Sequence, residues 1–583
     1  MGSLFVGVRA ALGPSSRGPL AETLFLATGV AVILGLAAAA LCTTNERRLA
    51  VIDVVTLIVG LALALVQFVG VTSTVILGGT DETLLNRLAM TTLLRDQNPY
   101  THVYGLVGAD GYGTPLLSGG QANTYGYPPL SLEIGRILGF ISPRLAAPGV
   151  VGAIALTTLA VAAFVALPRS WRAVSIVMVF GFGLVTPAAI AGLPIVLAVA
   201  LLCGPLWRWT ATGRGGRLGR VGVAQAVFLG LAAAAQQLSW FLAAFLVVSL
   251  VLVRRGELGT SRALAVIGRY CAVTVGTFVV VNSPFIVADP GAWAHAMAST
   301  LVQKAIVDGS SWALPAIEAN GGTGTLTVLS YAAVLLLLGV LVVYVVGLKT
   351  FAPAVVVAPS LVFLLSSRSN SEYFYSFLPI WLVAAATVDR SALAASRPIA
   401  VPRPLRRVAS TRRGRTVLGV AAILPAVVVF LVGVTGRPPM TLHPVAATLN
   451  GTAIQTVTLD VTNTSGHRID PQYFIDLRTA ITHPWVPVYG PRVLGPHQRG
   501  VVVLRPRTRL ESAQVTADLW VMSTIEAPAG MAAQQIRLHP DQVTVHGVTG
   551  RSTQAQLRRA CLARLLSGRN LDCNTQLGLT SVG

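Results

Sequence analysis

The sequence predicts a polytopic α-helical membrane protein of about twelve transmembrane helices with a β-sandwich domain at its C-terminal end. Three observations support this fold class. Of 583 residues, 54% are apolar and only 11% are charged, about half the charged fraction of soluble domains. Long charge-free runs alternate with short Arg-rich stretches up to about residue 435. From Arg437 onwards, apolar and polar residues alternate instead, as in half-buried strands.

Each predicted span is an apolar run of membrane-crossing length. A bilayer requires about 20 apolar residues, and only a helix satisfies its own backbone groups within lipid. The predicted spans are residues 20–42, 51–77, 147–167, 173–189, 193–209, 221–236, 238–253, 264–287, 324–347, 350–366, 374–388 and 416–435. Residues 130–140 are too short to span and contain Glu133 and Arg136, so we expect an interfacial or re-entrant helix.

The basic residues cluster between these runs. The clusters are Arg47/Arg48, Arg169/Arg172, residues 208–220, Arg254/Arg255/Arg262, Lys349 and residues 390–415. Counting spans places every cluster on one side, as expected for the cytoplasmic face of a cell membrane. The net charge of +21 is therefore assigned to contacts with membrane lipid rather than to nucleic-acid binding, since no basic stretch is interleaved with aromatics.

This topology divides the chain into predicted units. Residues 1–435 form the transmembrane domain, with two large outer segments at residues 78–146 and 288–323. Residues 436–550 form an extracytoplasmic β-sandwich, and residues 551–583 form a helix and tail. No cleavable signal peptide is expected, because the first apolar run is too long and no small-residue cleavage site follows it.

The exported C-terminal region has period-two runs at residues 456–462, 473–477 and 515–521, separated by Gly- and Pro-containing turns. Cys561 and Cys573 are the two cysteines of that region. Two thiols in an oxidising compartment are expected to pair, so we predict a disulfide between them.

An acidic pair follows the second predicted span. In GGTDETLLN (residues 78–86), Asp81 and Glu82 lie at the membrane surface, where neighbouring carboxylates have raised pKa values. Such a carboxylate can accept a proton from an attacking hydroxyl. Alternatively, the pair stabilises a helix start, as Asp commonly does.

The acidic pair is followed by Asn98-Pro99-Tyr100 and by YGYPPL (residues 125–130). With AQQLSWF (residues 235–241), and NSPF (residues 282–285) followed by DPGAW (residues 289–293), this order resembles the GT-C superfamily of polytopic glycosyltransferases. It is most similar to the polyprenyl-phosphate-mannose-dependent mannosyltransferases of glycosyltransferase family 87. The resemblance covers about residues 50–390, with two departures: an extra N-terminal span, and no His in the late outer loop RSNSEY (residues 368–373).

The resemblance implies a sugar donor carried on a polyprenyl phosphate. Cations at the membrane surface would bind its phosphate, and our candidates are Arg368, Lys304 and Arg95. Ordinary anchoring at the headgroup level is the alternative for each of them. The candidates for substrate binding are Asn98, Tyr100, His102, Tyr127 and Gln237.

The expected reaction is an inverting transfer to a cell-envelope glycan or glycolipid. Asp81 would be the general base, and Glu82 would orient Asp81 or bind the acceptor. Mannose and arabinose are the expected sugars. No metal is required, because phosphate is a good leaving group, although a divalent metal remains compatible.

Two other functions stay open. A transporter or flippase for a lipid-linked envelope precursor would share the helices and the basic surface, but it commonly shows paired halves and midplane charges. The third is a non-catalytic scaffold that holds envelope enzymes together through the C-terminal domain.

Overall fold

The computed structural model describes residues 20–73, 81–104, 113–181, 185–396, 411–450, 453–476, 483–506, 520–527, 529–536 and 543–546. The predicted C-terminal helix and the Cys561–Cys573 disulfide lie outside these residues. Cys42, Cys203 and Cys271 are free thiols.

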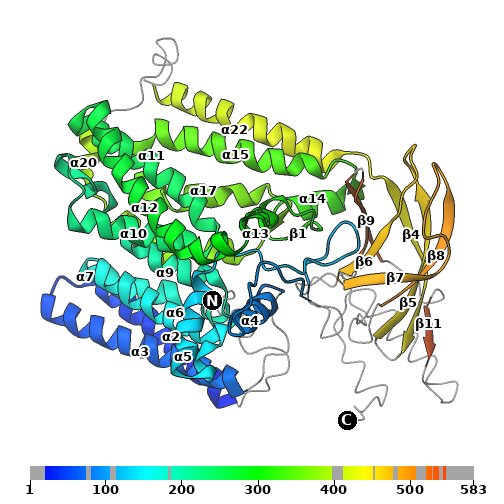
Figure 1. The fold of residues 1–583 in the computed structure, drawn as a ribbon, viewed down its shortest axis with the longest axis horizontal. Helices are drawn as coiled ribbons and strands as arrows, with labels where there is room; N and C mark the ends of the chain where they lie inside the picture. Colours follow the sequence, from blue (N-terminus) through cyan, green and yellow to red (C-terminus); the bar gives the residue numbers. More distant parts are fainter. Residues whose placement is uncertain are drawn as a thin grey trace.

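Among the described residues, six helices are long and apolar enough to cross a membrane, which indicates a multi-pass membrane protein. They are α3 (Glu46–Ser73), α6 (Pro148–Ala166), α11 (Leu238–Leu258), α12 (Thr260–Ala288), α15 (Thr327–Val346) and α22 (Arg412–Thr435). Further apolar helices pack with them: α2 (Leu20–Cys42), α9 (Pro194–Leu206) and α10 (Gly219–Ala235). Figure 1 shows these helices as one bundle.

Three predicted spans are not continuous helices. Residues 173–189 divide into α7 (Arg169–Ile176), the π-helical turn η2 (Val177–Gly181) and α8 (Val185–Ile190). The other two are divided into short helices that include α16 (Leu348–Phe351), α17 (Val357–Ser360), α18 (Glu372–Tyr375) and α19 (Leu378–Ala386). Pro187, Pro353, Pro359 and Pro379 lie in these segments. Each proline removes a backbone donor, and apolar composition alone does not reveal the resulting breaks.

The longest helix contact joins α15 to α22, which run side by side along one edge of the bundle (Figure 1). A Cβ atom on Gly339 of α15 would lie 2.3 Å from the carbonyl oxygen of Ala422 in α22. Only glycine allows the backbones to approach this closely, a common device between membrane helices. The pair leads directly to the C-terminal sheet.

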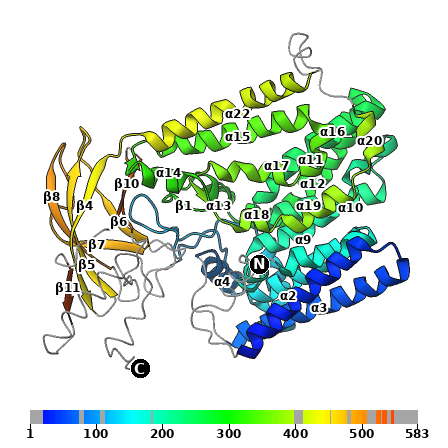
Figure 2. The same ribbon diagram turned by 180° about the vertical axis from the view of Figure 1, so that it is seen from behind.

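The C-terminal region forms one curled, mainly antiparallel sheet at one end of the bundle (Figure 2). Within the described residues its strand order is β11-β4-β5-β8-β7-β6-β9-β10-β2. The strands are β2 (Gly322–Thr323), β4 (Met440–Asn450), β5 (Ala453–Asn463), β6 (Gln472–Asp476), β7 (His483–Tyr489), β8 (Arg499–Pro506), β9 (Trp520–Ile525), β10 (Gly530–Gln535) and β11 (Val543–His546).

The predicted two-layer sandwich is wrong in its layering, although the strands themselves are present. Strand pairing is continuous from β11 to β2, so the sheet curls around its own core as a half-barrel. Bulges in the β4–β5 and β7–β8 pairs accompany this curl, since an extra residue bends a strand and increases its twist. Periodicity predicts alternating strands, but it does not determine how many layers they form.

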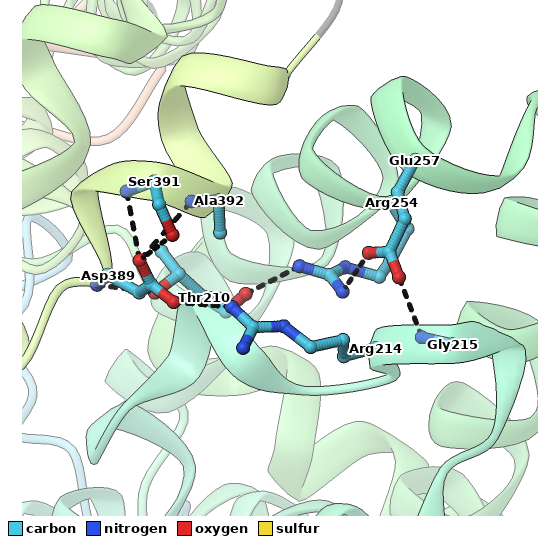
Figure 3. Close-up of polar contacts among 8 residues, drawn as sticks. All are labelled: Thr210, Arg214, Gly215, Arg254, Glu257, Asp389, Ser391 and Ala392. Atoms are coloured by element: carbon cyan, nitrogen blue, oxygen red, sulfur yellow. Dashed lines mark hydrogen bonds and ion pairs between the residues drawn. The ribbon is translucent and has the colours of Figure 1, made fainter.

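The end of the bundle opposite the sheet is held by a polar network (Figure 3). Arg254, near the end of α11, is 1% exposed and donates a 2.6 Å hydrogen bond to the carbonyl oxygen of Thr210. Arg254 also pairs with Glu257, which accepts a hydrogen bond from the backbone of Gly215. Asp389, at the start of α20 (Arg390–Ala395), pairs with Arg214. The network therefore joins α11, the loop before α10 and the segment before α20.

Candidate functional site

The site begins at α4 (Asp81–Leu93), which opens on the acidic pair. Carboxylates in a first helical turn are favoured by the helix dipole. The side chain of Glu82 is buried, at 8% exposure, facing an aromatic cluster rather than solvent. Burial, and after it the charge of Glu82, raises the pKa of Tyr125 well above its ordinary value. Glu82 and Tyr125 therefore lie close enough to interact electrostatically.

A cluster of aromatic side chains packs against α4. Tyr100 is buried, with its ring centroid 5.7 Å from that of Tyr125 and 5.2 Å from that of Phe285. The ring of Tyr127 lies 5.7 Å from that of Tyr125. Leu85, from the first turns of α4, belongs to the same buried cluster. Residues far apart in the sequence thus form one wall beside the acidic helix.

Hydrogen bonds fix the loop that carries these rings. The hydroxyl of Tyr100 donates to the carbonyl oxygen of Tyr127 at 2.8 Å. The side-chain amide of Gln237 donates to the carbonyl oxygen of Gly126 at 2.5 Å and to the hydroxyl of Thr300 at 3.2 Å. Gln237 lies at the turn between α10 and α11, so the tip of this helix hairpin anchors the loop. Three of the predicted substrate-binding residues, Tyr100, Tyr127 and Gln237, are therefore brought together.

Asn98 and His102 lie beside the same tyrosines. The side-chain oxygen of Asn98 accepts from the backbone of Tyr100 at 3.0 Å, while its buried amide nitrogen has no hydrogen-bond partner among the described residues. His102 Nδ1 lies 3.1 Å from the carbonyl oxygen of Asn98, and its ring stacks on Tyr104. The NPY motif therefore shapes a turn as well as lining the cluster.

The two later motifs of the sequence also meet near this wall. The indole nitrogen of Trp293 donates to the side-chain oxygen of Asn282 at 3.0 Å. Asp289 caps α13 (Pro290–Val302) by accepting from the backbone of Ala292. One hydrogen bond thus joins the NSPF and DPGAW segments, and Asp289 caps the helix that follows, so each segment has a structural role.

The predicted phosphate-binding cations occupy other positions. Lys304 is exposed and pairs with Glu526 of the C-terminal sheet at 3.3 Å. Arg368 lies in the short strand β3 (Arg368–Ser369), in register with Asp308 of β1 (Asp308–Gly309). Arg95 follows the other end of α4, which the helical rise separates from Asp81 by about 20 Å. Arg95 is therefore far from the acidic pair.

Two residues of the cluster were not among the predicted site residues. Tyr125 is fully buried, and its hydroxyl has no hydrogen-bond partner among the described residues. Glu133 lies in the first turn of α5 (Leu130–Ile141), where burial raises the pKa of its carboxyl. Glu133 also contributes, after burial and Tyr125, to the raised pKa of Tyr100. The sequence signal for Tyr125 was its position in the YGYPP motif, but single residues of a motif do not reveal which hydroxyl is buried.

Helix α5 matches the predicted interfacial helix. Leu132 is buried against the aromatic cluster, whereas Ile137, Phe140 and Ile141 are exposed, Phe140 at 80%. An exposed apolar side is what an interfacial or re-entrant helix requires. The site therefore borders both an acidic helix start and a helix with exposed apolar side chains.

Among the side chains that the structure describes, no group of three His, Cys, Asp or Glu residues is placed to hold a metal ion. The chemistry on view is the buried carboxylate of Glu82, buried tyrosines and side-chain amides, whereas the side chain of Asp81 lies outside the part of the chain that the structure describes. Comparison of the chain with protein-family models, curated protein sequences and solved structures finds no match.

Proposed function

We propose that this chain is a membrane glycosyltransferase that moves a sugar from a polyprenyl-phosphate donor to a cell-envelope glycan or glycolipid. Mannose or arabinose is the sugar that the GT-C-like order of motifs favours. In this proposal the sheet end of the bundle faces the outside of the cell membrane, and the Arg254 network faces the cytoplasm. The site then lies where a lipid-linked donor and an envelope acceptor can meet.

One observation carries the proposal. The acidic start of α4 lies against a buried wall of tyrosines, and the charge of Glu82 acts on Tyr125. A carboxylate beside aromatic rings and amides suits a sugar, whose hydroxyls need hydrogen bonds and whose carbon faces pack on rings. Amides from Asn98 and Gln237, which lie in the same wall, add donors and acceptors.

The proposed reaction needs one base and one leaving group. Asp81 accepts the proton of an acceptor hydroxyl, whose oxygen attacks the anomeric carbon of the donor sugar. The bond from that carbon to the phosphate oxygen breaks, and its electron pair leaves with the polyprenyl phosphate. Lys304 and Arg368 are proposed to stabilise that phosphate. A single displacement inverts the anomeric centre, and a divalent metal is compatible with this scheme.

The test is the substitution Asp81→Asn, which keeps the size of the side chain but removes its ability to accept a proton at neutral pH. Loss of a general base lowers the rate by about 10²- to 10⁴-fold. The assay measures transfer from a synthetic polyprenyl-phosphate sugar to an envelope-glycan acceptor in detergent. Glu82→Gln is the matched variant, and it should lose less activity because its proposed role is orientation.

If Asp81 only stabilises the start of α4, Asn replaces it with little loss, because both residues favour helix starts. Full activity of Asp81→Asn would therefore remove Asp81 from the base position. Absence of turnover by the unmodified protein with every such donor would instead favour the transporter.

A further inference from the structure

The loop that leads into the aromatic wall is held by the C-terminal sheet. Residues 113–127, which we call the strap, run from the sheet to Tyr125 and Tyr127 (Figures 1 and 2). The hydroxyl of Thr524 in β9 donates to the carbonyl oxygen of Leu117 in the strap at 3.0 Å, and this bond is buried. A sheet residue more than 400 positions later in the chain therefore fixes the middle of the strap.

A second contact lies beside the first. Gln472 of β6 is the register partner of Thr524, so the two side chains share one face of the sheet. A Cβ atom on Gly119 would lie 2.1 Å from the side-chain oxygen of Gln472, and Gly119 has a φ of +80°. Only glycine therefore fits the strap against the sheet at this turn.

The two faces of the sheet belong to different cores at this point. Phe474, Met522 and Met531 are buried in the core of the helix bundle, together with Leu117 of the strap. Their neighbours Tyr473 and Val521 are buried in the core of the half-barrel. Strands β6, β9 and β10 are thus covered on both faces, so packing holds this part of the sheet in place from both sides.

Hydrogen bonds connect the strap to the residues of the candidate site. The backbone N–H of Leu117 donates to the carbonyl oxygen of Lys304 at 2.9 Å. The backbone N–H of Ile306 donates to the carbonyl oxygen of Pro115 at 3.0 Å. Farther along, the backbone N–H of Tyr104 donates to the carbonyl oxygen of Asn123 at 2.7 Å, two residues before Tyr125. Gln237 then holds Gly126 at the far end of the strap.

We infer that the C-terminal sheet positions the acceptor-binding loop, with Thr524 as the positioning residue that acts through Leu117 and the strap. Only the acceptor-binding role of the loop rests on the proposed function. The contacts of Thr524 and Gln472 with the strap, which we call the clamp, belong to the fold, and their effect can be measured without any substrate.

The experiment uses the full chain in detergent with Thr524→Val, which keeps the shape of the side chain but removes the hydroxyl. We expect hydrogen–deuterium exchange in residues 113–127 to become about threefold to tenfold faster, as one hydrogen bond is lost. In the transfer assay, KM for the acceptor should rise by a similar factor, about threefold to tenfold, with kcat nearly unchanged. Thr524→Ser retains the hydroxyl and should restore both values.

The matched control is Thr458→Val in β5, which is separated from β9 by β8, β7 and β6 and should leave the strap unchanged. If Thr524→Val does not yield folded protein, Gln472→Ala tests the neighbouring contact, and faster strap exchange is again expected.

Unchanged exchange in the strap of a folded Thr524→Val or Gln472→Ala variant would overturn the inference. If strap exchange becomes faster in the variant but the unmodified protein transfers no sugar, the clamp between the sheet and the strap is retained. That outcome rejects only the proposed glycosyltransferase activity. Faster exchange with an unchanged acceptor KM would reject the positioning role.

Discussion

The hydroxyl of Tyr125 is the polar group whose position is hardest to explain by folding alone. It is fully buried beside Glu82 and has no hydrogen-bond partner among the described residues. A buried polar atom without a partner lowers stability. If the aromatic cluster binds a sugar as proposed, this hydroxyl is free to hydrogen-bond to it.

The substitution Tyr125→Phe separates a role in binding from a role in folding. Because it removes an unpaired hydroxyl and keeps the ring, the free energy of unfolding should stay level or rise by about 1 kcal/mol. Sugar transfer should nevertheless fall. Thermal unfolding in detergent and the transfer assay measure the two effects on the same preparation.

Tyr104→Phe provides the matched control, since its hydroxyl donates to the carbonyl oxygen of Pro99 at 3.0 Å. Loss of that bond should lower stability by about 1 kcal/mol. Equal losses of stability in the two variants would show that the Tyr125 hydroxyl has a structural partner.

At this scale the sequence predicts which segments lie together better than which side chains meet. Tyr100, Tyr127 and Gln237 were predicted as substrate-binding residues, and they do lie together. Arg95 was predicted by its charge to share the site with the acidic pair, and the structure separates it from Asp81 by the length of α4. Charge and motif identify candidates, but the direction of a helix decides which of them meet.

At the scale of elements, the Arg254 network shows how helix ends are joined. The buried guanidinium of Arg254 bonds to Thr210, and its partner Glu257 reaches Gly215 in the same loop. Nearby, hydrogen bonds from Ser391 and then from Arg214 hold the pKa of Asp389 below its usual range, so this carboxylate stays charged. The segment between α9 and α10 is thereby fixed to the end of α11 and to the start of α20 by side-chain contacts.

Arg254→Met tests this network, because methionine keeps much of the stem but leaves Glu257 without its cation. Breaking a buried ion pair by removing one partner costs about 3–5 kcal/mol, and we expect about 2–3 kcal/mol because Glu257 is partly exposed. A fall in the melting temperature in detergent measures the effect.

Arg255→Met is the control from the same helix turn, and it should change the melting temperature little. If the two variants lower the melting temperature equally, the helix end rather than the network supplies the stability.

The element predictions failed where two environments meet. Strands β9 and β10 are buried on both faces, so their residues do not alternate between apolar and polar and give a weak strand signal. Strand β5 has one face toward the half-barrel core and alternates clearly, and it was predicted within residues 456–462. Strand β6 is also covered on both sides yet falls in the predicted run 473–477, so burial on both faces weakens the periodic signal without always removing it.

At the scale of the whole molecule, the alternation of basic clusters predicts which end of the bundle faces the cytoplasm. Single cysteines introduced near Asp81, Gly309 and Asn463 should react with a membrane-impermeant reagent in intact cells. Positions near Gly216 and Ala409 should not react. The sheet and the site lie at one end of the bundle and the Arg254 network at the other, which is the arrangement that this pattern requires (Figure 1).

Labelling near Ala409 without labelling near Asn463 would invert the orientation. It would also place the acidic start of α4 in the cytoplasm, where an envelope acceptor is absent. The same set of variants thus bears on both the topology and the proposed function.

The ninth strand of the sheet has a consequence for biosynthesis. Strand β2 is only two residues long and belongs to the loop before α15, yet it pairs with β10, which the ribosome completes about 200 residues later. While the later helices are being inserted, residues 322 and 323 have no partner strand. The sheet end of the protein can therefore reach its final shape only after nearly the whole chain has been made and its C-terminal strands have reached β2. A nascent chain stopped before β10 should retain its inserted helices but lack the pairing of β2 with β10.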